Sequence, residues 1–318
     1  MSGHKLSTTI TRLPLMSVQS QSRVTGLHPS MPSSPERYFP DGRVHRRWIT
    51  SGQTAGMAAL QVEGISFRYT GANALSEVTF TVGPGVTALL GVNGAGKSTL
   101  MSICAGLLTP KTGAVHIASH ALYSRTHRRA ALAAVSLMPQ ATSFPANLTA
   151  RDVVTYLGWL RGLPRSAASA RAEECLVAVG LHEVADRKCG TFSGGMTRRL
   201  ALAQALVSQP EVILLDEPST GLDPQQRRGM VELIRALPAT VLLSSHVVED
   251  VEDLAAHVIV LDGGRVVFDG TTAALTEGIE VTGRRSAVEA GFLRAIAAES
   301  THPDGAPGTP GARERGAR

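Results

Sequence analysis

The stretch GVNGAGKST at residues 91–99 constrains the fold of this chain more than any other part of its sequence. It matches the pattern G-x-x-x-x-G-K-[ST], in which a glycine-rich loop binds phosphate groups. The apolar run VTALL at 86–90 precedes it, and a segment of helical spacing that ends near Gly106 follows it. A strand, a glycine-rich loop and a helix in this order are the context in which the pattern is functional. The sequence therefore predicts a nucleotide-phosphate site in an α/β domain.

The residue types in this loop suit a nucleoside triphosphate together with a divalent cation. Glycine allows the backbone turns that point consecutive N–H groups at one phosphate. Lys97 supplies a positive charge between the β- and γ-phosphates, and the Ser98 hydroxyl is a hard oxygen ligand for Mg²⁺. We therefore expect the following residues to bind ATP: Gly91, Asn93, Gly94, Ala95, Gly96, Lys97, Ser98 and Thr99.

A second motif, VILLDEPSTGLDP at 212–224, supplies two adjacent carboxylates. The buried strand predicted at 212–215 ends at Asp216, so this carboxylate should lie at the sheet edge beside the glycine-rich loop and hold Mg²⁺ through water. Glu217 should point in a different direction, because successive strand residues alternate. Glu217 is therefore the candidate that orients the attacking water for hydrolysis of the nucleotide.

The remaining strand pattern predicts two kinds of sheet. The segments LQVEGISFRY and LSEVTFTV, which begin at Leu60 and Leu75, alternate as half-buried strands. Short apolar runs that are followed by a helix or a loop are typical of a buried parallel sheet. Such runs occur at 86–90, 133–138, 212–215 and 240–245. Residues 258–268 are a predicted hairpin with glycine at its turn.

Helices interrupt this strand pattern at roughly 144–190. The first is predicted after Thr149, which is a suitable N-cap, with Val153, Leu157 and Leu160 on one face. A second helix is predicted from about residue 166 to the glycine at 180.

A further helix is predicted in TFSGGMTRRLALAQAL at 191–206, where a serine and two glycines precede the helical pattern. The N-terminus of a helix favours an anion, because free N–H groups and the helix dipole both attract negative charge. However, the stretch contains no lysine and no general base suited to phosphate chemistry. The residues alone leave open whose phosphate it would hold.

Composition limits the classes of function. The formal net charge of +5 is already present in residues 1–56, which contain seven Lys and Arg but two acidic residues. The patterned part is close to neutral, so nucleic acid is not a predicted partner. Cys104, Cys175 and Cys189 show no metal-ligand spacing and are expected to be buried small hydrophobic residues in a reducing compartment. No apolar run is long enough to cross a bilayer.

Both ends of the chain differ in composition from the patterned part. Residues 1–56 are rich in Ser, Thr, Pro, Arg and Gly, and residues 301–318 in Pro, Gly, Ala and Arg, so both are predicted to be unstructured tails. Two other interpretations of 1–56 stay open. Translation could begin at Met57, or, as a less favoured hypothesis, the acid-free first 35 residues could be an organelle transit peptide. The predicted folded domain spans 57–300.

Six motifs in a fixed order give the chain a family resemblance. The glycine-rich loop is followed by LMPQ with Gln140, and then by FSGG, LDEP, GLDP and LLSSH. From about Leu60 to Glu280 the sequence resembles the ATP-binding cassette of ABC transporters. The resemblance implies an α/β fold of the P-loop NTPase type, with a mostly parallel sheet, an N-terminal antiparallel β subdomain and a helical insert at about 144–190.

The resemblance also implies roles for residues whose own chemistry is ambiguous. Tyr69 would stack on adenine, and Gln140 would contact both Mg²⁺ and the attacking water. Asp223 would lie in a loop at the subunit boundary, and His246 would contact the γ-phosphate. The implied catalytic residues are thus Glu217, His246 and Gln140, and the implied metal ligands are Ser98, Gln140 and Asp216.

In ABC ATPases two cassettes pack head to tail, which bears on the stretch at 191–206. By resemblance, Ser193, Gly194 and Gly195 would close over the γ-phosphate held by a second cassette, identical to this one or different in sequence. Phe192 and Met196 stand where many cassettes have Leu and Gln. With TRRL after Met196, the stretch is similar to the drug- and antibiotic-exporter branch.

The resemblance therefore implies an ATPase subunit that powers an exporter of drugs, antibiotics or similar compounds. It would be peripheral, bound at the cytoplasmic side of the cell membrane to a separate transmembrane permease. Three alternatives stay open: the ATPase of an importer, a soluble ABC ATPase that acts on ribosomes or DNA, and an unrelated P-loop NTPase such as a kinase. The segment between Lys97 and Ser193 lacks the sustained heptads of a chromosome ATPase, and a kinase needs neither FSGG nor His246.

Overall fold

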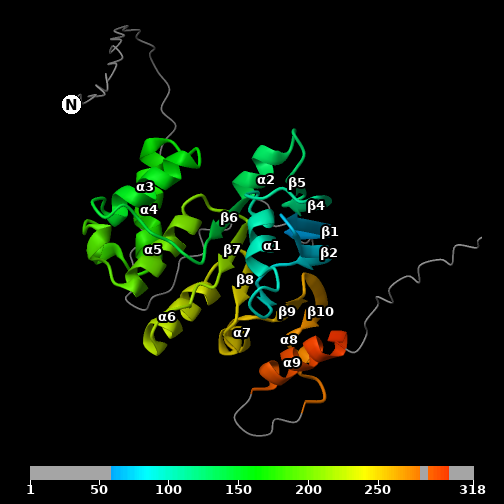
Figure 1. Cartoon of the computed structure of the whole chain (residues 1–318). Helices are drawn as coiled ribbons and strands as arrows, with labels where there is room; N and C mark the ends of the chain where they lie inside the picture. The colour runs from blue at the N-terminus through cyan, green and yellow to red at the C-terminus, as the bar shows by residue number, and fades with distance from the viewer. Residues whose placement is uncertain (1–58, 280–285, 301–318) are drawn as a thin grey trace, which may run out of the picture. The chain divides into compact units, whose positions relative to one another are not determined.

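The computed structural model describes residues 59–279 and 286–300, so the tails predicted at 1–56 and 301–318 lie outside the described residues. The described strands form two sheets (Figure 1). The larger has the order β10-β9-β3-β8-β7-β6, in which β10 is antiparallel to β9 and the other neighbours are parallel. Its strands are β3 (Val86–Leu90), β6 (Val135–Met138), β7 (Val212–Asp216), β8 (Thr240–Ser245), β9 (His257–Asp262) and β10 (Arg265–Thr271).

The mostly parallel sheet is confirmed, and burial explains its sequence pattern. Every residue of β7 and β8 is buried, as expected for strands that are covered on both faces. Because β6, β7, β8 and β3 run in the same direction, their carboxyl ends meet along one edge of the sheet. The strand predicted at 133–138 begins later, at Val135, because the two preceding alanines end helix α2.

The smaller sheet is antiparallel and has the order β2-β1-β4-β5. Its strands are β1 (Leu60–Tyr69), β2 (Ala72–Val82), β4 (Thr112–Ile117) and β5 (His120–Ala121). The first two were predicted, whereas β4 was not. Its second residue, Gly113, approaches β1 so closely that a Cβ would lie 2.4 Å from the carbonyl oxygen of Glu63. A glycine inside a strand weakens the pattern by which the strand is predicted, although here the close backbone approach requires it.

Helix α1 packs between the two sheets, because one hydrophobic cluster contains Leu100, Met101 and Ile103 of α1 together with residues of β1, β2 and β7. Helices α3, α4 and α5 form a separate group beside β6 (Figure 1). The helices are α1 (Lys97–Cys104), α2 (Arg128–Ala134), α3 (Ala150–Leu160), α4 (Arg165–Ala178), α5 (Gly194–Leu206), α6 (Pro224–Arg235), α7 (Val248–Leu254), α8 (Thr272–Thr276) and α9 (Ala287–Ser300). Short 3₁₀ turns occupy His182–Val184 and Cys189–Thr191.

The start of α3 is as predicted, but the apolar residues predicted on one face are not all buried. Thr149 caps the helix in a reciprocal capping box with Asp152. The sequence places Leu160 on one face of the helix with Val153 and Leu157, yet Leu160 is 55% exposed, whereas Val153 is buried. The reason is a close helix contact at Gly158, where a Cβ would lie 3.0 Å from Val207 and 3.3 Å from Ala168. This contact turns the glycine side of α3 toward α4 and α5, and leaves Leu160 in solvent.

The three cysteines are free and buried, as predicted. Burial raises the pKa of the Cys104 and Cys175 thiols to about 12, so both stay protonated at neutral pH. Of the helices in the described ranges, none combines the length and the apolar character that crossing a bilayer requires.

Candidate functional site

The glycine-rich loop at 91–99, called the P-loop below, connects β3 to α1 as predicted. Gly94 and Gly96 have φ angles of 84° and 106°, a left-handed backbone that favours glycine. A Cβ at Gly91 would lie 2.4 Å from the carbonyl oxygen of Leu261 in β9. Gly91 is therefore required by packing, and Gly94 and Gly96 by backbone conformation.

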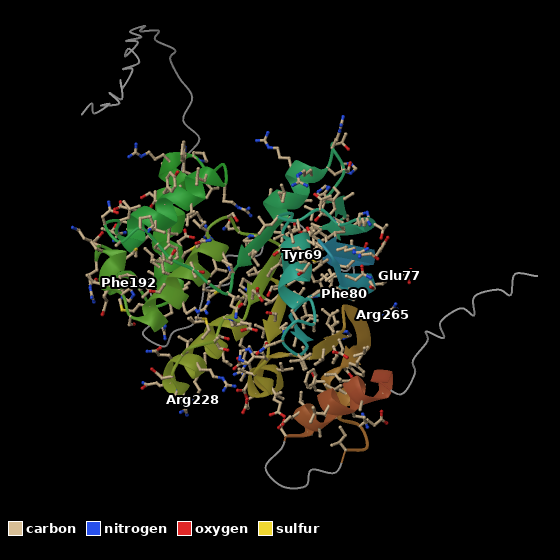
Figure 2. The ribbon with its side chains drawn as sticks, viewed as in Figure 1. Tyr69, Glu77, Phe80, Phe192, Arg228 and Arg265 are labelled. Atoms are coloured by element: carbon tan, nitrogen blue, oxygen red, sulfur yellow. The ribbon has the colours of Figure 1, made fainter. Side chains whose placement is uncertain are left out.

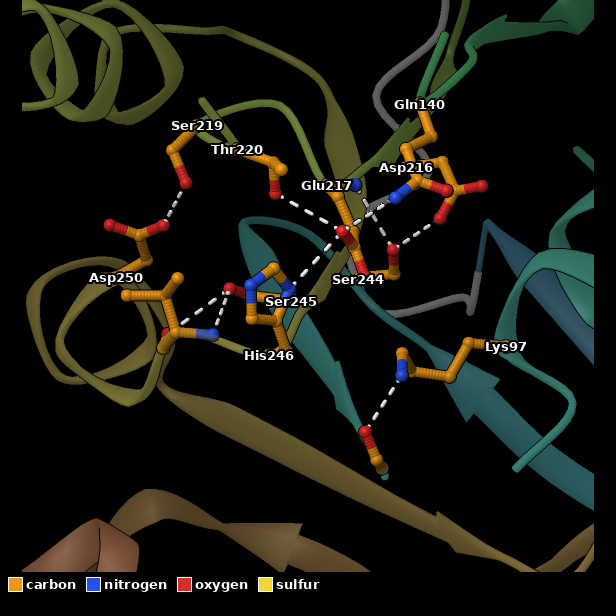
Figure 3. Close-up of polar contacts among 12 residues, drawn as sticks. Lys97, Gln140, Asp216, Glu217, Ser219, Thr220, Ser244, Ser245, His246 and Asp250 are labelled. Carbon is orange, nitrogen blue, oxygen red and sulfur yellow. Dashed lines mark hydrogen bonds and ion pairs between the residues drawn. The ribbon is translucent and has the colours of Figure 1, made fainter. Parts of the chain in front are cut away.

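Lys97 is the first residue of α1, and its side chain turns back over the P-loop. Its Nζ donates to the carbonyl oxygens of Gly91 at 2.7 Å and Val92 at 3.2 Å, and Figure 3 shows one of these two contacts. Burial lowers the pKa of Lys97, while the carboxylates of Glu217 and Asp216 oppose this shift. A partly desolvated ammonium group interacts more strongly with phosphate than an exposed one, because the local dielectric is lower.

Asp216 ends β7 beside Ser244 of β8, its partner in the parallel register. The Ser244 hydroxyl donates to Asp216 Oδ1 at 2.5 Å (Figure 3). The same hydroxyl oxygen accepts the backbone N–H of Glu217 at 3.1 Å. One buried serine therefore fixes both the Asp216 carboxylate and the backbone of the next residue.

Glu217 leaves the strand with an unusual backbone and is only 8% exposed. Its φ of 49° is in the left-handed region, which costs a residue other than glycine on the order of 1–3 kcal/mol. Three side chains converge on Glu217 Oε2 (Figure 3). Gln140 Nε2 donates at 2.9 Å and Thr220 Oγ1 at 3.1 Å, and His246 Nδ1 lies 3.1 Å away.

The structure thus brings together predicted residues from three separate motifs. Gln140 follows β6, Glu217 follows β7 and His246 follows β8, and these strands are neighbours in the sheet. The parallel direction of the strands places all three residues at one edge, beside the P-loop that follows β3. This edge of an open α/β sheet is where such folds bind their ligands.

Tyr69 lies near the same site at the end of β1. Its hydroxyl is 3.4 Å from Thr99 Oγ1 at the end of the P-loop. Phe67 supports the ring edge-on, with the ring centroids 4.9 Å apart. Half of the Tyr69 surface stays exposed, so its aromatic face is accessible to a planar group beside the P-loop.

Ser193, Gly194 and Gly195, called the SGG segment below, are not brought to the P-loop. Figure 2 shows Phe192, the residue before Ser193, well separated from Tyr69. Ser193 caps α5 and accepts the backbone N–H of Met196 at 3.2 Å. A Cβ at Gly194 would meet open space, whereas one at Gly195 would lie 2.6 Å from Gln226 Oε1 of α6. The front of the SGG segment is therefore open, and its back packs on α6.

Asp223 has a role in this chain that was not predicted from its sequence. It is the N-cap of α6, and its Oδ1 accepts the backbone N–H groups of Gln225 at 3.0 Å and Gln226 at 2.9 Å. Because Gln226 also lies against Gly195, Asp223 and the SGG segment belong to the same region of the surface.

Ser244 and Thr220 contact the predicted carboxylates, and both were missed. Ser244 was visible as the first of two serines that end the apolar run at 240–245. Polar residues at the end of a buried parallel strand are a signal for a site, but their partner depends on strand order. Thr220 lies in a loop, where no pattern distinguishes a contact from a solvent-exposed hydroxyl.

The residues present fit a magnesium nucleotide. Ser98 is exposed in the first turn of α1, and Asp216 and Gln140 end or follow neighbouring strands. Hydroxyl, carboxylate and amide oxygens are the hard ligands that Mg²⁺ prefers, and Mg²⁺ commonly takes few protein ligands when phosphate supplies others. The N-terminus of α1 and the Lys97 amine favour phosphate. Glu217 and His246 are in direct contact at the same edge of the sheet, so both could reach a group bound beside the P-loop (Figure 3).

Comparisons with known proteins identify relatives of this chain. The sequence profile of the family described as "ABC transporter" matches residues 75–220. The daunorubicin/doxorubicin resistance ATP-binding protein DrrA of Streptomyces peucetius is 36% identical, over 70% of this chain and 68% of that protein. The Nod factor export ATP-binding protein I of Burkholderia lata is also 36% identical, over 70% of this chain and 73% of that protein.

A solved structure of an ATP-binding subunit of an ABC transporter superposes with a TM-score of 0.63 and 27% identity. It covers 77% of this chain and is itself matched over its whole length. The α/β fold with its P-loop is therefore that of the ABC ATPases. At these identities, and over these shares of both relatives, the chain belongs to the ATP-binding subunits of ABC transporters, which hydrolyse ATP.

Proposed function

We propose that this chain powers the export of drugs, antibiotics or similar compounds through a separate membrane permease. The observation that carries the direction of transport is the similarity to a Nod factor export protein and a daunorubicin/doxorubicin resistance protein at 36% identity. The chain would act as a peripheral subunit at the cytoplasmic side of the cell membrane. Two cassettes, identical or different in sequence, would serve one permease.

The P-loop residues would hold the phosphates, with the Lys97 amine between the β- and γ-phosphates. Ser98, Asp216 and Gln140 are the residues that would hold Mg²⁺, which when bound neutralises charge on the phosphates. Gln140 donates to Glu217 through Nε2, so its amide oxygen is the atom that it would offer to the metal. Tyr69 would stack on the adenine ring.

Glu217 would act as the general base for hydrolysis. Its carboxylate accepts a hydrogen bond from water and takes a proton as the water oxygen bonds to the γ-phosphorus and the bond to the β-phosphate oxygen breaks. His246 would stabilise the γ-phosphate, and its contact with Glu217 Oε2 supports a shared position at that phosphate. The SGG segment and the Asp223 loop of a second cassette would close the site.

Transport by vesicles tests the proposed direction. The chain would be expressed together with its permease, and ATP-dependent movement of daunorubicin would be measured in inside-out membrane vesicles. Export from the cell corresponds to uptake by these vesicles, and Glu217→Gln should abolish it. ATP-driven release from preloaded inside-out vesicles would instead identify an importer and overturn the proposal.

A further inference from the structure

A buried acidic residue outside the site described above contacts the loop that carries Glu217. Asp250 lies in α7 and is only 2% exposed. The Ser219 hydroxyl donates to Asp250 Oδ2 (Figure 3), and Arg227 Nε of α6 donates to Asp250 Oδ1 at 2.6 Å. A carboxylate removed from water is unfavourable unless it is paired and hydrogen-bonded, and Asp250 is both.

Ser219 is closely linked to Glu217 along the chain. Pro218 lies between them, and its ring fixes one backbone angle of this short connection. The Thr220 N–H donates to the Glu217 carbonyl at 3.3 Å, and the Thr220 hydroxyl donates to the Glu217 carboxylate at 3.1 Å. Ser219 is itself buried. A shift of Ser219 would therefore move Glu217. Without these contacts, the strained left-handed backbone of Glu217 would relax.

Asp250 also lies four residues after His246, at the end of a short segment that is anchored at both ends. Ser245 Oγ accepts the Val247 N–H at 2.9 Å and holds the chain just after His246. Figure 3 shows Ser219 and Asp250 on one side and Glu217 and His246 beside them. The Ser219–Asp250 contact thus joins the loop at 217–223, called the Glu217 loop, to the helix that follows His246.

We propose that Asp250 is a positioning residue for ATP hydrolysis. It holds Ser219, and through Ser219 it keeps the Glu217 carboxylate in position beside His246. This role rests on the proposed functions of Glu217 and His246. Misplacement of a catalytic group by about 1 Å can cost on the order of 10²-fold in rate, so a hydroxyl that fixes the Glu217 loop has a measurable effect.

Ser219→Ala is the main test, because it removes the hydroxyl and leaves the Asp250–Arg227 pair intact. In the purified full-length chain, kcat for ATP should fall about tenfold while KM for ATP changes little, because binding and positioning are separate. Glu249→Gln is the matched control. Glu249 also contacts Arg227, at 3.3 Å from Nη2, but it is exposed, so kcat should stay within about twofold of the parent.

Asp250→Ala and the double variant Ser219→Ala with Asp250→Ala complete the experiment. If Asp250 acts through Ser219, the double variant should be no slower than Asp250→Ala alone. If Asp250→Ala fails to fold, the kcat of Ser219→Ala still tests the proposal. A Ser219→Ala chain with a lowered Tm and an unchanged kcat well below that Tm would show a structural role only, and would overturn the proposal.

Glu217→Gln separates this proposal from the one on which it rests. If Glu217→Gln retains full hydrolysis, the proposed function of Glu217 is wrong, and the role of Asp250 falls with it. If Glu217→Gln abolishes hydrolysis while Ser219→Ala has the kcat of the parent, only the role of Asp250 is wrong. A tenfold drop in Ser219→Ala together with an inactive Glu217→Gln supports both.

Discussion

Two regions that we propose to contact phosphate, the surroundings of Glu217 and the SGG segment, differ in how many contacts organise them within one chain. Glu217 Oε2 is contacted by Gln140, Thr220 and His246, and the preceding carboxylate is held by a buried serine. The SGG segment has its helix cap and its packing against α6, but its Ser193 and Gly194 are exposed. The Glu217 region is organised by contacts inside the chain, whereas the SGG segment presents an exposed surface.

Under the proposed function, this difference accounts for the absence of a lysine and a general base from the SGG segment. A helix N-terminus with an exposed serine and glycine can hold a phosphate but cannot activate water. The groups that can do so are gathered around Glu217, at the other end of the short loop that leads to Asp223. Each chain therefore carries the chemistry for one nucleotide and, as we propose, the closing surface for another.

The largest expected effect is at the Glu217 region. Glu217→Gln should keep ATP affinity and lose about 10²–10⁴-fold in turnover, because removal of a general base affects the chemical step. Lys97→Ala should lose ATP binding itself, because it removes the charge between the phosphates. Nucleotide titration and steady-state hydrolysis of both variants provide the measurement. An equal loss of ATP affinity in the two variants would contradict the assigned roles.

The open region is tested by mixing two inactive variants, Lys97→Ala and Ser193→Arg. In a head-to-tail heterodimer, one site contains both defects and the other has an intact P-loop and an intact SGG segment. Random pairing of equal populations makes roughly half of the dimers heterodimers, so occlusion of ATP should return in about that fraction.

Occlusion is the appropriate measurement here, because steady hydrolysis can require both sites. Each variant alone is the control, and dimer formation is verified by size. If the SGG segment acted on the P-loop of its own chain, every site would contain a defect, and mixing would restore nothing. That outcome, with demonstrable dimers, would remove the proposed difference between the two regions.

Substitution of one glycine in the P-loop and one in the SGG segment tests the same comparison through the stability of the monomer. Gly91→Ala should destabilise the monomer by about 1–3 kcal/mol, because its Cβ would meet the backbone of Leu261 at 2.4 Å. Gly194→Ala has open space and should leave the monomer Tm and its ATP affinity unchanged, while it weakens occlusion in the dimer. Thermal unfolding of both variants, with and without ATP, distinguishes them. A lowered monomer Tm in Gly194→Ala would count against an open front.

Much of the fold could be predicted from the sequence, because buried parallel strands and the P-loop have strong local patterns. The runs at 86–90, 212–215 and 240–245 are strands β3, β7 and β8. Strand β4 was missed, since Gly113 lies within it and weakens the strand pattern. The periodicity of α3 could not predict that Leu160 is exposed, because a close contact at Gly158 sets the helix orientation and no periodicity encodes that contact.

The candidate site was predictable only where a motif marks it. Gln140, Glu217 and His246 each follow a strand, and the structure places them together. Ser244 and Asp250 were not found, since their contacts depend on which strands and helices are neighbours. Serine is common at strand ends, and an acidic residue in a helix is ordinarily solvent-exposed. Side-chain contacts of this kind depend on the folded arrangement and cannot be predicted from local sequence patterns.

The smallest expected effect concerns Ser193, which has two roles that different substitutions separate. As the N-cap of α5 its hydroxyl accepts the Met196 N–H at 3.2 Å, and in the dimer we expect the same residue to contact the γ-phosphate of a second cassette. Ser193→Ala should cost about 1 kcal/mol of monomer stability, whereas Ser193→Gly should cost only about a few tenths, because glycine is tolerated at N-caps. The corresponding shifts in Tm are roughly 2–4 °C and about 1 °C or less. Both variants lack the hydroxyl, so both should weaken ATP occlusion in the dimer to the same extent. If occlusion instead followed Tm, with Ser193→Gly close to the parent, Ser193 would act only as a helix cap, and the exposed SGG segment would need a different explanation.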